Sequence, residues 1–435
     1  MPRVIVVGAG VAGLGAAYTL QKAGVEVQVL ESEPVVGGRM RSREWNGAWI
    51  DLGAEFIADV GFPDALFREL GIMAERVTYP GGSVAFDVWR DGRANRFDYT
   101  DPAGILKYDG MSALEKARLV SLIPAMARQW KESRGAPYGE TWHGAWADDE
   151  SIETWLSRRA PAFLEYAIEP MFELYCGWEP HNFSKGAFLS TAFFPRPEEI
   201  YTFRRGLGTV TEALANRLDV TTGARVTKVD LEPSPVVVEW TENGAPRRGE
   251  ADLVLVAVPG SRVLDFTRGL DTRRTAFFEK VEYVPHELPF FTVTEPPVGV
   301  PGSLFIPRRE DRDVAAIGYD VSSTNPEVKF LRISMKSGFV RRYIDRDDEE
   351  ALDAIVAAGA RRYPQITPLV KDRFVSRWRE GLPAFGVGSM RRLRDFIALR
   401  PQRGVAFAGD YLATGSTGAA YTTGQWAAAD ALRRL

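Results

Sequence analysis

The sequence predicts an α/β fold, in which a Rossmann-like domain carries an inserted α+β domain built from a mixed sheet and a helical region. Three features support this. A glycine fingerprint follows an apolar run near the N-terminus, helical periodicity replaces strand signals in the middle of the chain, and a second apolar run ending in glycine lies near the C-terminus. We therefore expect the two ends of the chain to meet in one domain.

The N-terminal segment has the layout of a nucleotide-binding unit. An apolar, β-branched run at 4–7 predicts a strand buried on both faces. A helical segment follows to about residue 23, and the run at 25–30 predicts a second strand. Glycines can also serve only to shape a turn. That explanation does not account for a strand, the glycines, a helix, a second strand and an acidic residue in this order.

Each fingerprint residue has its own expected role. Gly8 permits a tight turn, Gly10 lets the backbone approach a pyrophosphate, and Gly13 lets helix and strand pack closely. The phosphates would lie at the helix N-terminus, where unpaired N–H groups and the helix dipole favour anions. Glu31, after the second strand, would accept hydrogen bonds from a ribose hydroxyl and repel a 2′-phosphate.

Length and charge narrow the class of protein. The chain has 435 residues, enough for about two or three domains. Its net charge of −4 gives no general attraction to nucleic acid. No apolar run approaches the ~18 residues of a membrane span. Because the first strand begins at residue 4, we expect no cleavable leader, and a cytoplasmic location is the default expectation. The expected partner is a small-molecule substrate rather than a nucleic acid.

Cysteine and histidine usage argues against a metal centre. Cys176 is the single cysteine, so no intrachain disulfide, iron–sulfur cluster or zinc-thiolate site can form. The histidines His143, His181 and His286 show no ligand spacing. We expect no metal, and any redox chemistry would need a bound organic cofactor.

The Gly-Gly-Arg run at 37–39, shortly after Glu31, resembles a motif of the FAD-binding amine oxidase superfamily. That superfamily includes protoporphyrinogen oxidases, carotenoid desaturases and polyamine oxidases. Physically, Gly38 allows close backbone approach and Arg39 offers charge-assisted hydrogen bonds to a diphosphate. The resemblance implies an FAD cofactor. Covalent attachment of the flavin through cysteine is not expected, because Cys176 lies outside every flavin motif.

The segment 49–56 resembles the next flavin-side motif of the same superfamily. There Gly53 and Ala54 would lie near the isoalloxazine. L-amino acid oxidases of the superfamily carry an arginine at the position of Phe56 to hold the substrate carboxylate. Phe56 therefore argues against an α-amino acid substrate.

The segment 112–130 predicts an amphipathic helix. Ser112 and Glu115 form a capping box, and Pro124 should kink or end the helix. Its apolar positions Leu114, Ala117, Val120 and Leu122 are expected to pack on their own domain, and peripheral contact with a membrane surface is the alternative.

The aromatic-rich stretch 187–203 has two open interpretations. Its rings and Arg196 can line an apolar cavity for a flat substrate, or they can form core at a domain junction. The substrate-pocket candidates are Phe56, Phe194, Arg196, Tyr201 and Phe385.

The remaining chain matches the order of motifs in the superfamily. No second glycine fingerprint with a preceding strand appears, so a nicotinamide domain is not expected. The run 404–410 predicts a buried strand, and 415–420 opens the last helix. Further elements are expected as a helix at 211–218, strands at 218–231, 236–240, 253–259, 290–294, 314–319 and 330–335, and a helix at 347–363.

The expected division of the chain is as follows: 1–60, 205–262 and 386–435 in the FAD-binding domain, 61–204 in a mainly helical part of the substrate domain, and 263–385 in its sheet part. The residues implied in cofactor binding are Gly8, Gly10, Ala12, Gly13, Glu31, Gly38, Arg39, Met40, Gly53, Ala54, Glu55, Val226, Trp378, Gly409, Asp410, Thr417, Gly418 and Ala419.

The resemblance implies transfer of a hydride from a substrate C–H to flavin N5, with dioxygen or another acceptor taking the electrons. Amine oxidases often frame the flavin with two aromatic rings, but Ser416 occupies one expected position and only Phe385 suits the other. The lysine expected to hold a water beside the flavin has no clear counterpart.

We therefore expect an oxidase or desaturase like protoporphyrinogen oxidase or carotenoid desaturase. The alternatives are an amine oxidase that makes an imine and hydrogen peroxide, and a redox-neutral isomerase. No catalytic residue is assigned; Tyr201, Glu55 and His286 stay open as the base, and the oligomeric state is also open.

Overall fold

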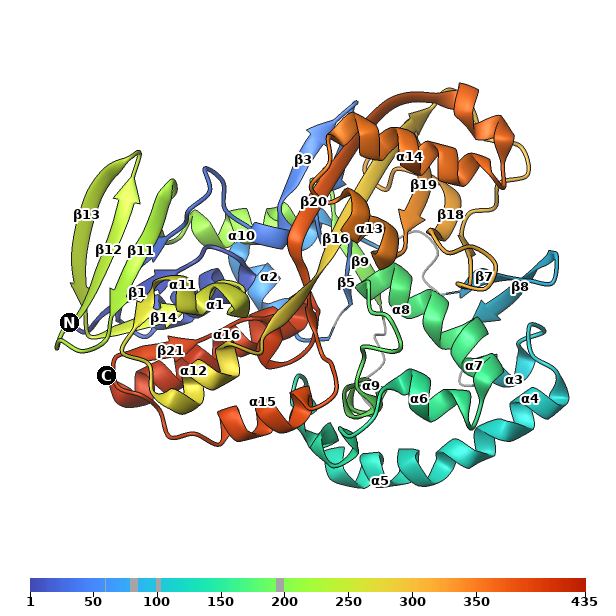
Figure 1. Cartoon of the computed structure of the whole chain (residues 1–435). Coiled ribbons are helices and arrows are strands. Elements are labelled where there is room, and N and C mark those ends of the chain that lie inside the picture. The colour runs from blue at the N-terminus through green and yellow to red at the C-terminus, as the bar shows by residue number, and fades with distance from the viewer. Residues whose placement is uncertain (59, 79–84, 99–102, 193–198) are drawn as a thin grey trace.

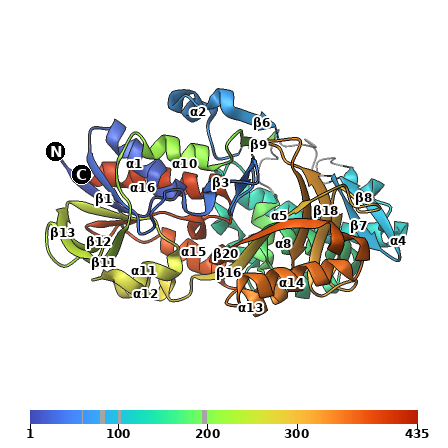
Figure 2. The same cartoon turned by 90° about the horizontal axis from the view of Figure 1, so that it is seen from above.

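The computed structural model describes residues 1–58, 60–78, 85–98, 103–192 and 199–435. Figure 1 shows a parallel-sheet part that holds both termini, beside a mixed-sheet part with the helical region below it. The two termini lie close together in Figure 1 and in the perpendicular view of Figure 2. The predicted α/β class and the meeting of the chain ends are confirmed.

A five-stranded parallel sheet forms the centre of the first part. Val4 and Val6 of its central strand face a helical layer, whereas Ile5 and Val7 face an antiparallel sheet. The apolar run at 4–7 is thus buried on both sides, as its lack of alternation predicts. The strands, in spatial order, are β10 (Asp219–Thr221), β2 (Glu26–Leu30), β1 (Arg3–Val7), β14 (Leu253–Val256) and β21 (Val405–Phe407).

The helical layer and the antiparallel sheet complete this part. The helices are α1 (Val11–Lys22), α2 (Asp64–Leu70), α10 (Gly208–Ala215) and α16 (Thr417–Arg434). The antiparallel sheet holds β13 (Ala245–Ala251), β12 (Val236–Glu242) and β11 (Ala224–Asp230), with β15 (Thr267–Arg268) parallel at its edge. Next to this sheet pack α11 (Val263–Phe266), α12 (Thr272–Phe278) and α15 (Ser389–Ile397).

The second part is built on a seven-stranded mixed sheet. Its two long strands, β16 and β20, run from the parallel-sheet part into this sheet (Figure 1). Leu304 and Ile317 pack under α13 (Ser337–Tyr343) and α14 (Asp348–Ala360), whereas their neighbours Phe305 and Ala316 pack on the opposite face. In spatial order the strands are β20 (Val370–Ala384), β16 (Glu282–Val293), β19 (Lys329–Met335), β18 (Val314–Val321), β17 (Leu304–Phe305), β7 (Ala85–Arg90) and β8 (Arg93–Asp98).

The segment 61–204 is less purely helical than predicted. It contains β6 (Arg76–Thr78), β7, β8 and β9 (Ile200–Phe203), whose short runs lack clear alternation in the sequence. Small sheets pair β3 (Ser42–Trp45) with β4 (Ala48–Asp51), and β5 (Ile57–Ala58) with β9 and β6. Its helices are α3 (Gly104–Lys107), α4 (Ala113–Ala117), α5 (Ile123–Ser133), α6 (Ile152–Ser157), α7 (Pro161–Phe163), α8 (Glu169–Cys176) and α9 (Lys185–Thr191), with a π-helical turn at Leu164–Ile168.

Shorter 3-10 turns connect several of these elements. They lie at Gly38–Met40, Met73–Glu75, Arg118–Leu122, Thr141–Ala147, Gly260–Arg262, Pro364–Leu369 and Asp410–Leu412.

The predicted helix at 112–130 begins as expected but buries a different face. The capping box is confirmed, since Ser112 accepts from the Glu115 N–H and Glu115 accepts from the Ser112 N–H. The α-helix then becomes a 3-10 helix and restarts at Ile123, with Pro124 in the first turn. The prediction that the apolar positions pack on their own domain is confirmed for Leu122, which is buried, and wrong for Leu114, Ala117 and Val120, which are exposed. Leu119 and Met126 pack against the same core as Leu122.

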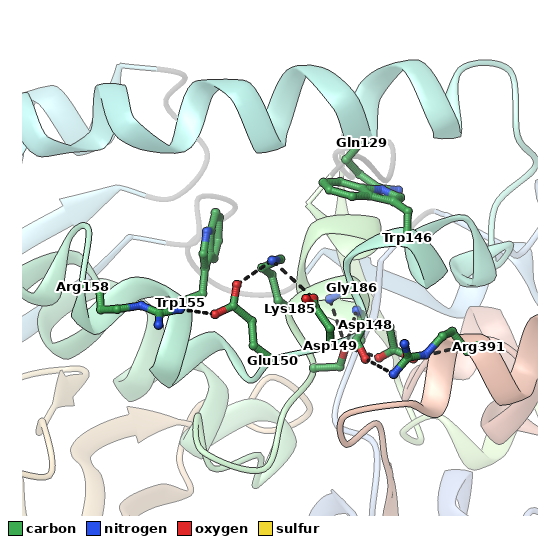
Figure 3. Close-up of polar contacts among 12 residues, drawn as sticks. Gln129, Trp146, Asp148, Asp149, Glu150, Trp155, Arg158, Lys185, Gly186 and Arg391 are labelled. Carbon is green, nitrogen blue, oxygen red and sulfur yellow. Dashed lines mark hydrogen bonds and ion pairs between the residues drawn. The ribbon is translucent and has the colours of Figure 1, made fainter.

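One polar cluster joins the helical region to the segment before the last strand (Figure 3). The buried carboxylate of Asp148 accepts from the Arg391 N–H at 2.9 Å and from the Ser184 hydroxyl. The Arg391 side chain donates to the Asp148 carbonyl at 2.9 Å. Burial nevertheless raises the pKa of Asp148. Next to it, Lys185 pairs with Glu150 at 2.6 Å, which fixes the start of α9.

The five-segment division of the chain stays a prediction. All strands of the parallel sheet come from the segments 1–60, 205–262 and 386–435, as that division requires. Residues 263–278, however, pack on the antiparallel sheet beside them.

Candidate active site

A cavity of about 1540 Å³ lies where the two parts meet. Small-molecule pockets usually measure roughly 300–1,000 Å³, so this one has room for a dinucleotide and a second molecule. We call the two ends the nucleotide end and the inner chamber. The nucleotide end is lined by Gly10, Glu31, Arg39, Val226 and Asp410. The inner chamber is lined by Glu55, Phe56, Asp87, Arg96, Leu174, Tyr175, His286, Glu287, Ile317, Asp320, Arg332 and Met335.

The surroundings of the three fingerprint glycines differ, and so does the reason for a glycine at each position. Gly8 has a φ of +104°, and a Cβ there would lie 2.8 Å from the Ala257 carbonyl oxygen. A Cβ on Gly13 would lie 2.1 Å from the Gly8 carbonyl oxygen, which would separate helix from strand. A Cβ on Gly10 would meet nothing within 4 Å, and its φ of −76° suits any residue. The protein itself does not require glycine at position 10, so this glycine fits a ligand that approaches the backbone.

The start of α1 offers unpaired donors to the cavity. No side chain caps the helix at Gly10, and Val11 and Ala12 line the cavity wall. The free N–H groups and the helix dipole therefore favour a phosphate at this point.

Glu31 is held rigidly at the end of β2. Its two carboxylate oxygens accept from the Ala9 N–H at 2.8 Å and from the Glu33 N–H at 2.9 Å. The Ser32 hydroxyl also donates to the oxygen that faces Glu33, at 3.3 Å. The oxygen that faces Ala9 keeps a further lone pair, so the side chain can also accept from a ribose hydroxyl.

Arg39 and Asp410 bring the N-terminal and C-terminal segments together. The Arg39 guanidinium donates to Asp410 at 2.7 Å and to the Gly381 carbonyl at 2.8 Å. The Tyr283 hydroxyl donates to the other Asp410 oxygen at 3.1 Å. Burial and the Asp410 charge raise the pKa of Tyr283, so this phenol stays protonated. Arg39 still lines the cavity, and its remaining N–H donors suit a diphosphate.

The segments expected near the flavin also meet at the cavity. Gly53 is tightly packed, because a Cβ there would lie 2.2 Å from the Arg39 carbonyl oxygen. The Trp378 indole N–H donates to the Leu52 carbonyl. At the start of α16, the Ser416 side chain accepts from the Ala419 N–H at 3.1 Å.

Most of the predicted cofactor residues line this one cavity, although their role in binding stays a prediction. Gly13 and Ala419 are not on its wall; Gly13 packs helix on strand, and Ala419 is fully buried behind the helix start. Those on the wall are Gly8, Gly10, Ala12, Glu31, Gly38, Arg39, Met40, Gly53, Ala54, Glu55, Val226, Trp378, Gly409, Asp410, Thr417 and Gly418.

Of the residues predicted to line the substrate pocket, only some lie on the wall of the inner chamber. Phe56 lines the inner chamber, edge-to-face with Tyr175 at 6.1 Å between ring centres. Tyr201 and Phe385 do not line it, which corrects their selection as pocket residues. Tyr201 packs between Phe67 and Phe203, and Phe385 packs on Trp178. Phe194 and Arg196 lie outside the described residues.

The acidic side chains of the inner chamber outnumber its basic ones. Glu55 pairs with Arg332 at 2.7 Å, and Asp87 lies 3.6 Å from Arg96. Within the described part of the chain, neither Glu287 nor Asp320 forms an ion pair. The wall also carries apolar side chains, among them Phe56, Leu174 and Met335, so the chamber favours a cationic ligand with an apolar body.

Glu287 is the most unusual group of the chamber. Its side chain is 4% exposed, and neither carboxylate oxygen has a hydrogen-bond partner among the described residues. Burial raises the pKa of Glu287 to about 7, although the Arg377 charge lowers it in part. The neighbouring His286 also lines the chamber, and burial lowers its pKa, so the imidazole is neutral near pH 7.

Sequence reasoning missed Glu287, Arg332 and Tyr138. Tyr138 comes from the segment 135–149 and lines the cavity, with its hydroxyl 2.8 Å from the Ser416 side chain. An aromatic ring thus stands beside the position where the sequence suggested that one was missing. The charged residue Glu287, directly before the mainly apolar run 288–293, was the available signal for a buried functional group.

The described residues contain neither a membrane-spanning helix nor a cluster of metal ligands. No helix of the described residues is long and apolar enough to cross a membrane. Among the same residues, no group of three or more histidine, cysteine, aspartate or glutamate side chains could hold a metal ion.

Comparison with known proteins identifies the family. The family model described as flavin containing amine oxidoreductase matches residues 11–432. Polyamine oxidase 2 from Arabidopsis thaliana is 26% identical over 472 residues, covering 100% of this chain and 89% of that protein. Mitochondrial protoporphyrinogen oxidase from Nicotiana tabacum is 29% identical over 187 residues, covering 42% of this chain and 34% of that protein.

A solved structure shares the fold along the whole chain. Putrescine oxidase, in the wild-type form bound to putrescine, matches with a TM-score of 0.75 at 21% identity, over 100% of this chain and 99% of that chain. The family implies a flavin cofactor, for which the cavity described above has the required donors. This chain belongs to the flavin-containing amine oxidoreductase family and is an enzyme of that family.

Proposed function

We propose that this enzyme is an FAD-dependent amine oxidase that converts an amine with an apolar body into an imine, with dioxygen as electron acceptor. The observation that carries the proposal is the carboxylate of Glu287, buried and unpaired in an apolar chamber. A cationic ammonium group offsets the cost of such a charge better than any neutral substrate can.

The relatives support the amine better than the porphyrinogen or polyene substrate that the sequence favours. The polyamine oxidase aligns with the whole chain, whereas the protoporphyrinogen oxidase aligns with 42% of it. Putrescine oxidase has the same fold over the full length. The redox-neutral isomerase keeps no specific support.

We further propose that the cofactor is FAD, bound without a covalent bond. The start of α1 and Arg39 would hold the diphosphate, Glu31 the ribose, and the backbone of Val226 the adenine. Gly53, Ala54 and the start of α16 would contact the flavin ring. When bound, FAD supplies the acceptor for the hydride that leaves the carbon next to the amine nitrogen.

The overall reaction balances with dioxygen. The amine loses two electrons and two protons and becomes an imine, and dioxygen gains them and becomes hydrogen peroxide. The chain's own task is to remove the ammonium proton, because only the neutral amine can push electrons toward the leaving hydride. Glu287, with a pKa of about 7, is suited to accept that proton. Phe56 and Ile317 line the chamber, and their apolar side chains would keep water from the reacting carbon.

A substrate panel tests this proposal. Under anaerobic conditions, primary amines and diamines should bleach the visible flavin absorption, whereas a porphyrinogen and a polyene should not. In air, each turnover should release one hydrogen peroxide per amine consumed. Bleaching by the porphyrinogen or polyene alone would contradict the proposal, and turnover of a substrate without peroxide or other net oxidation would favour the isomerase.

Acid precipitation tests the mode of cofactor attachment. We expect the flavin to appear in the supernatant, since the single cysteine lies outside the flavin motifs. A yellow pellet would contradict non-covalent binding, without affecting the substrate assignment.

A further inference from the structure

An exposed apolar stripe runs along the helices at residues 112–134. Leu114, Val120, Ile123 and Trp130 have exposed fractions of 70%, 65%, 57% and 53%. Exposed alanines at 117 and 127 complete a spacing of three to four residues, so the side chains follow one another along one side. We call the following residues the outer stripe: Leu114, Ala117, Val120, Ile123, Ala127 and Trp130.

The outer stripe is not needed to attach these helices to the protein. Leu122 is buried in the core on the inner face, with Met126 packed beside it. Gln129 is fully buried and accepts from the Trp146 indole N–H at 2.7 Å, a contact visible in Figure 3. A surface helix with one face packed is normally polar on the other, whereas this one is apolar there too.

The same segment is positively charged. Residues 112–134 carry five basic and two acidic side chains, a net charge of +3 against −4 for the whole chain. Arg118 and Lys131 are exposed, and in the described part of the chain neither pairs with a carboxylate. Arg134 lies over the Trp130 ring, 5.3 Å from its centre. Basic side chains thus flank the apolar ones.

We propose that the outer stripe binds the surface of an anionic lipid bilayer, with α4 and α5 lying in the plane of the headgroups. Apolar side chains would enter the boundary between headgroups and acyl chains, while Arg118 and Lys131 contact lipid phosphates. Trp130 suits this boundary because its ring is apolar and its N–H is polar. α5 lies at the lower edge of the molecule in Figure 1, where a flat surface can reach it.

A second copy of the chain fits the outer stripe less well. In a two-fold interface the same patch meets itself, so the net charge of +3 would face an equal charge. A bilayer with anionic headgroups instead supplies the opposite charge to this patch.

Vesicle sedimentation of the holoenzyme tests the proposal. The protein should sediment with vesicles of phosphatidylcholine mixed with phosphatidylglycerol, and not with phosphatidylcholine alone. The triple variant V120S/I123S/W130S and the double variant R118E/K131E should each lower the partition coefficient at least about tenfold. Binding should also weaken as salt concentration rises.

Two control variants separate a loss of vesicle binding at the outer stripe from the general effect of removing an exposed apolar side chain or changing the net charge. V298S removes an apolar side chain that is 84% exposed elsewhere, and R273E/K280E changes the net charge by the same amount at exposed positions outside the stripe. Both should bind vesicles like the wild type, and all variants should keep the wild-type rate with a soluble amine. Equal binding of the control and stripe variants would overturn the proposal. Failure to bind anionic vesicles would also overturn it. A wild-type dimer that forms without lipid, and that the triple substitution abolishes, would overturn it as well.

Discussion

Replacing Glu287 with glutamine is expected to lower kcat/KM for amines about 100-fold at pH 8 and, at the same time, to stabilise the protein. The first effect follows because glutamine cannot accept the ammonium proton; 100-fold corresponds to about 2.7 kcal/mol of transition-state stabilisation. In the wild type, kcat/KM should rise with pH as Glu287 ionises around pH 7. In the variant this limb of the pH profile should be absent.

The stability effect follows from the direction of the pKa shift. The folded-state pKa of Glu287 is raised from 4.5 to about 7, so the folded protein holds the proton more tightly than the unfolded chain. The free energy of unfolding of the wild type should therefore fall by about 3 kcal/mol between pH 4.5 and pH 7, and stay low above that. Glutamine removes this loss, so the variant should unfold at a higher temperature at pH 8 but not at pH 4.5.

Two measurements check this prediction, namely the pH profile of kcat/KM and thermal unfolding at the two pH values. D320N serves as a control, because Asp320 lines the chamber but accepts a hydrogen bond from the Val321 N–H at 2.7 Å. It should leave the acid limb near pH 7 in place. A glutamine variant at position 287 that is less stable at pH 8 and keeps the acid limb would show that Glu287 is only structural.

Replacing Gly10 with valine should abolish flavin binding while the protein still folds. A Cβ at this position meets no protein atom within 4 Å, and the extended backbone suits a β-branched residue. The fold should lose only about 1 kcal/mol, from a poorer helix N-cap. The valine methyl groups would instead occupy the space of the diphosphate, so the affinity for FAD should fall at least about 100-fold. Flavin absorbance per chain and thermal unfolding of the flavin-free protein measure the two effects.

The matched variant is Gly13→Val, three residues along the same fingerprint. Its Cβ would lie 2.1 Å from the Gly8 carbonyl oxygen, so it should disrupt the packing of α1 on β1 and yield little folded protein. A yellow, fully loaded Gly10→Val protein would refute the placement of the diphosphate. If both variants lose the same amount of folding stability, the assignment of Gly10 to ligand binding and of Gly13 to packing would be contradicted.

The sequence alone could predict the nucleotide end because its requirements are local. Gly8, Gly13 and Glu31 lie within one strand–helix–strand unit, and their spacing fixes their geometry. Gly409 and Asp410 come from the far end of the chain, but a strand followed by a glycine-rich helix start repeats the same local pattern.

The inner chamber could not be predicted in this way, because its residues meet only through the tertiary fold. Glu287 and Arg332 lie on different strands, and Tyr138 reaches Ser416 across 278 positions of sequence. Tyr201 and Phe385 were chosen for their aromatic character, yet aromatic rings stabilise a core as readily as they line a pocket. The helix at 112–130 shows a similar limit, since a change from α to 3-10 geometry altered which side is buried.

The most direct single measurement is the visible spectrum of the purified enzyme before and after anaerobic addition of an amine. We expect one non-covalent flavin per chain, bleached completely by one equivalent of amine and restored by air with release of hydrogen peroxide. A colourless protein, or a bound flavin that no amine can bleach, would contradict it.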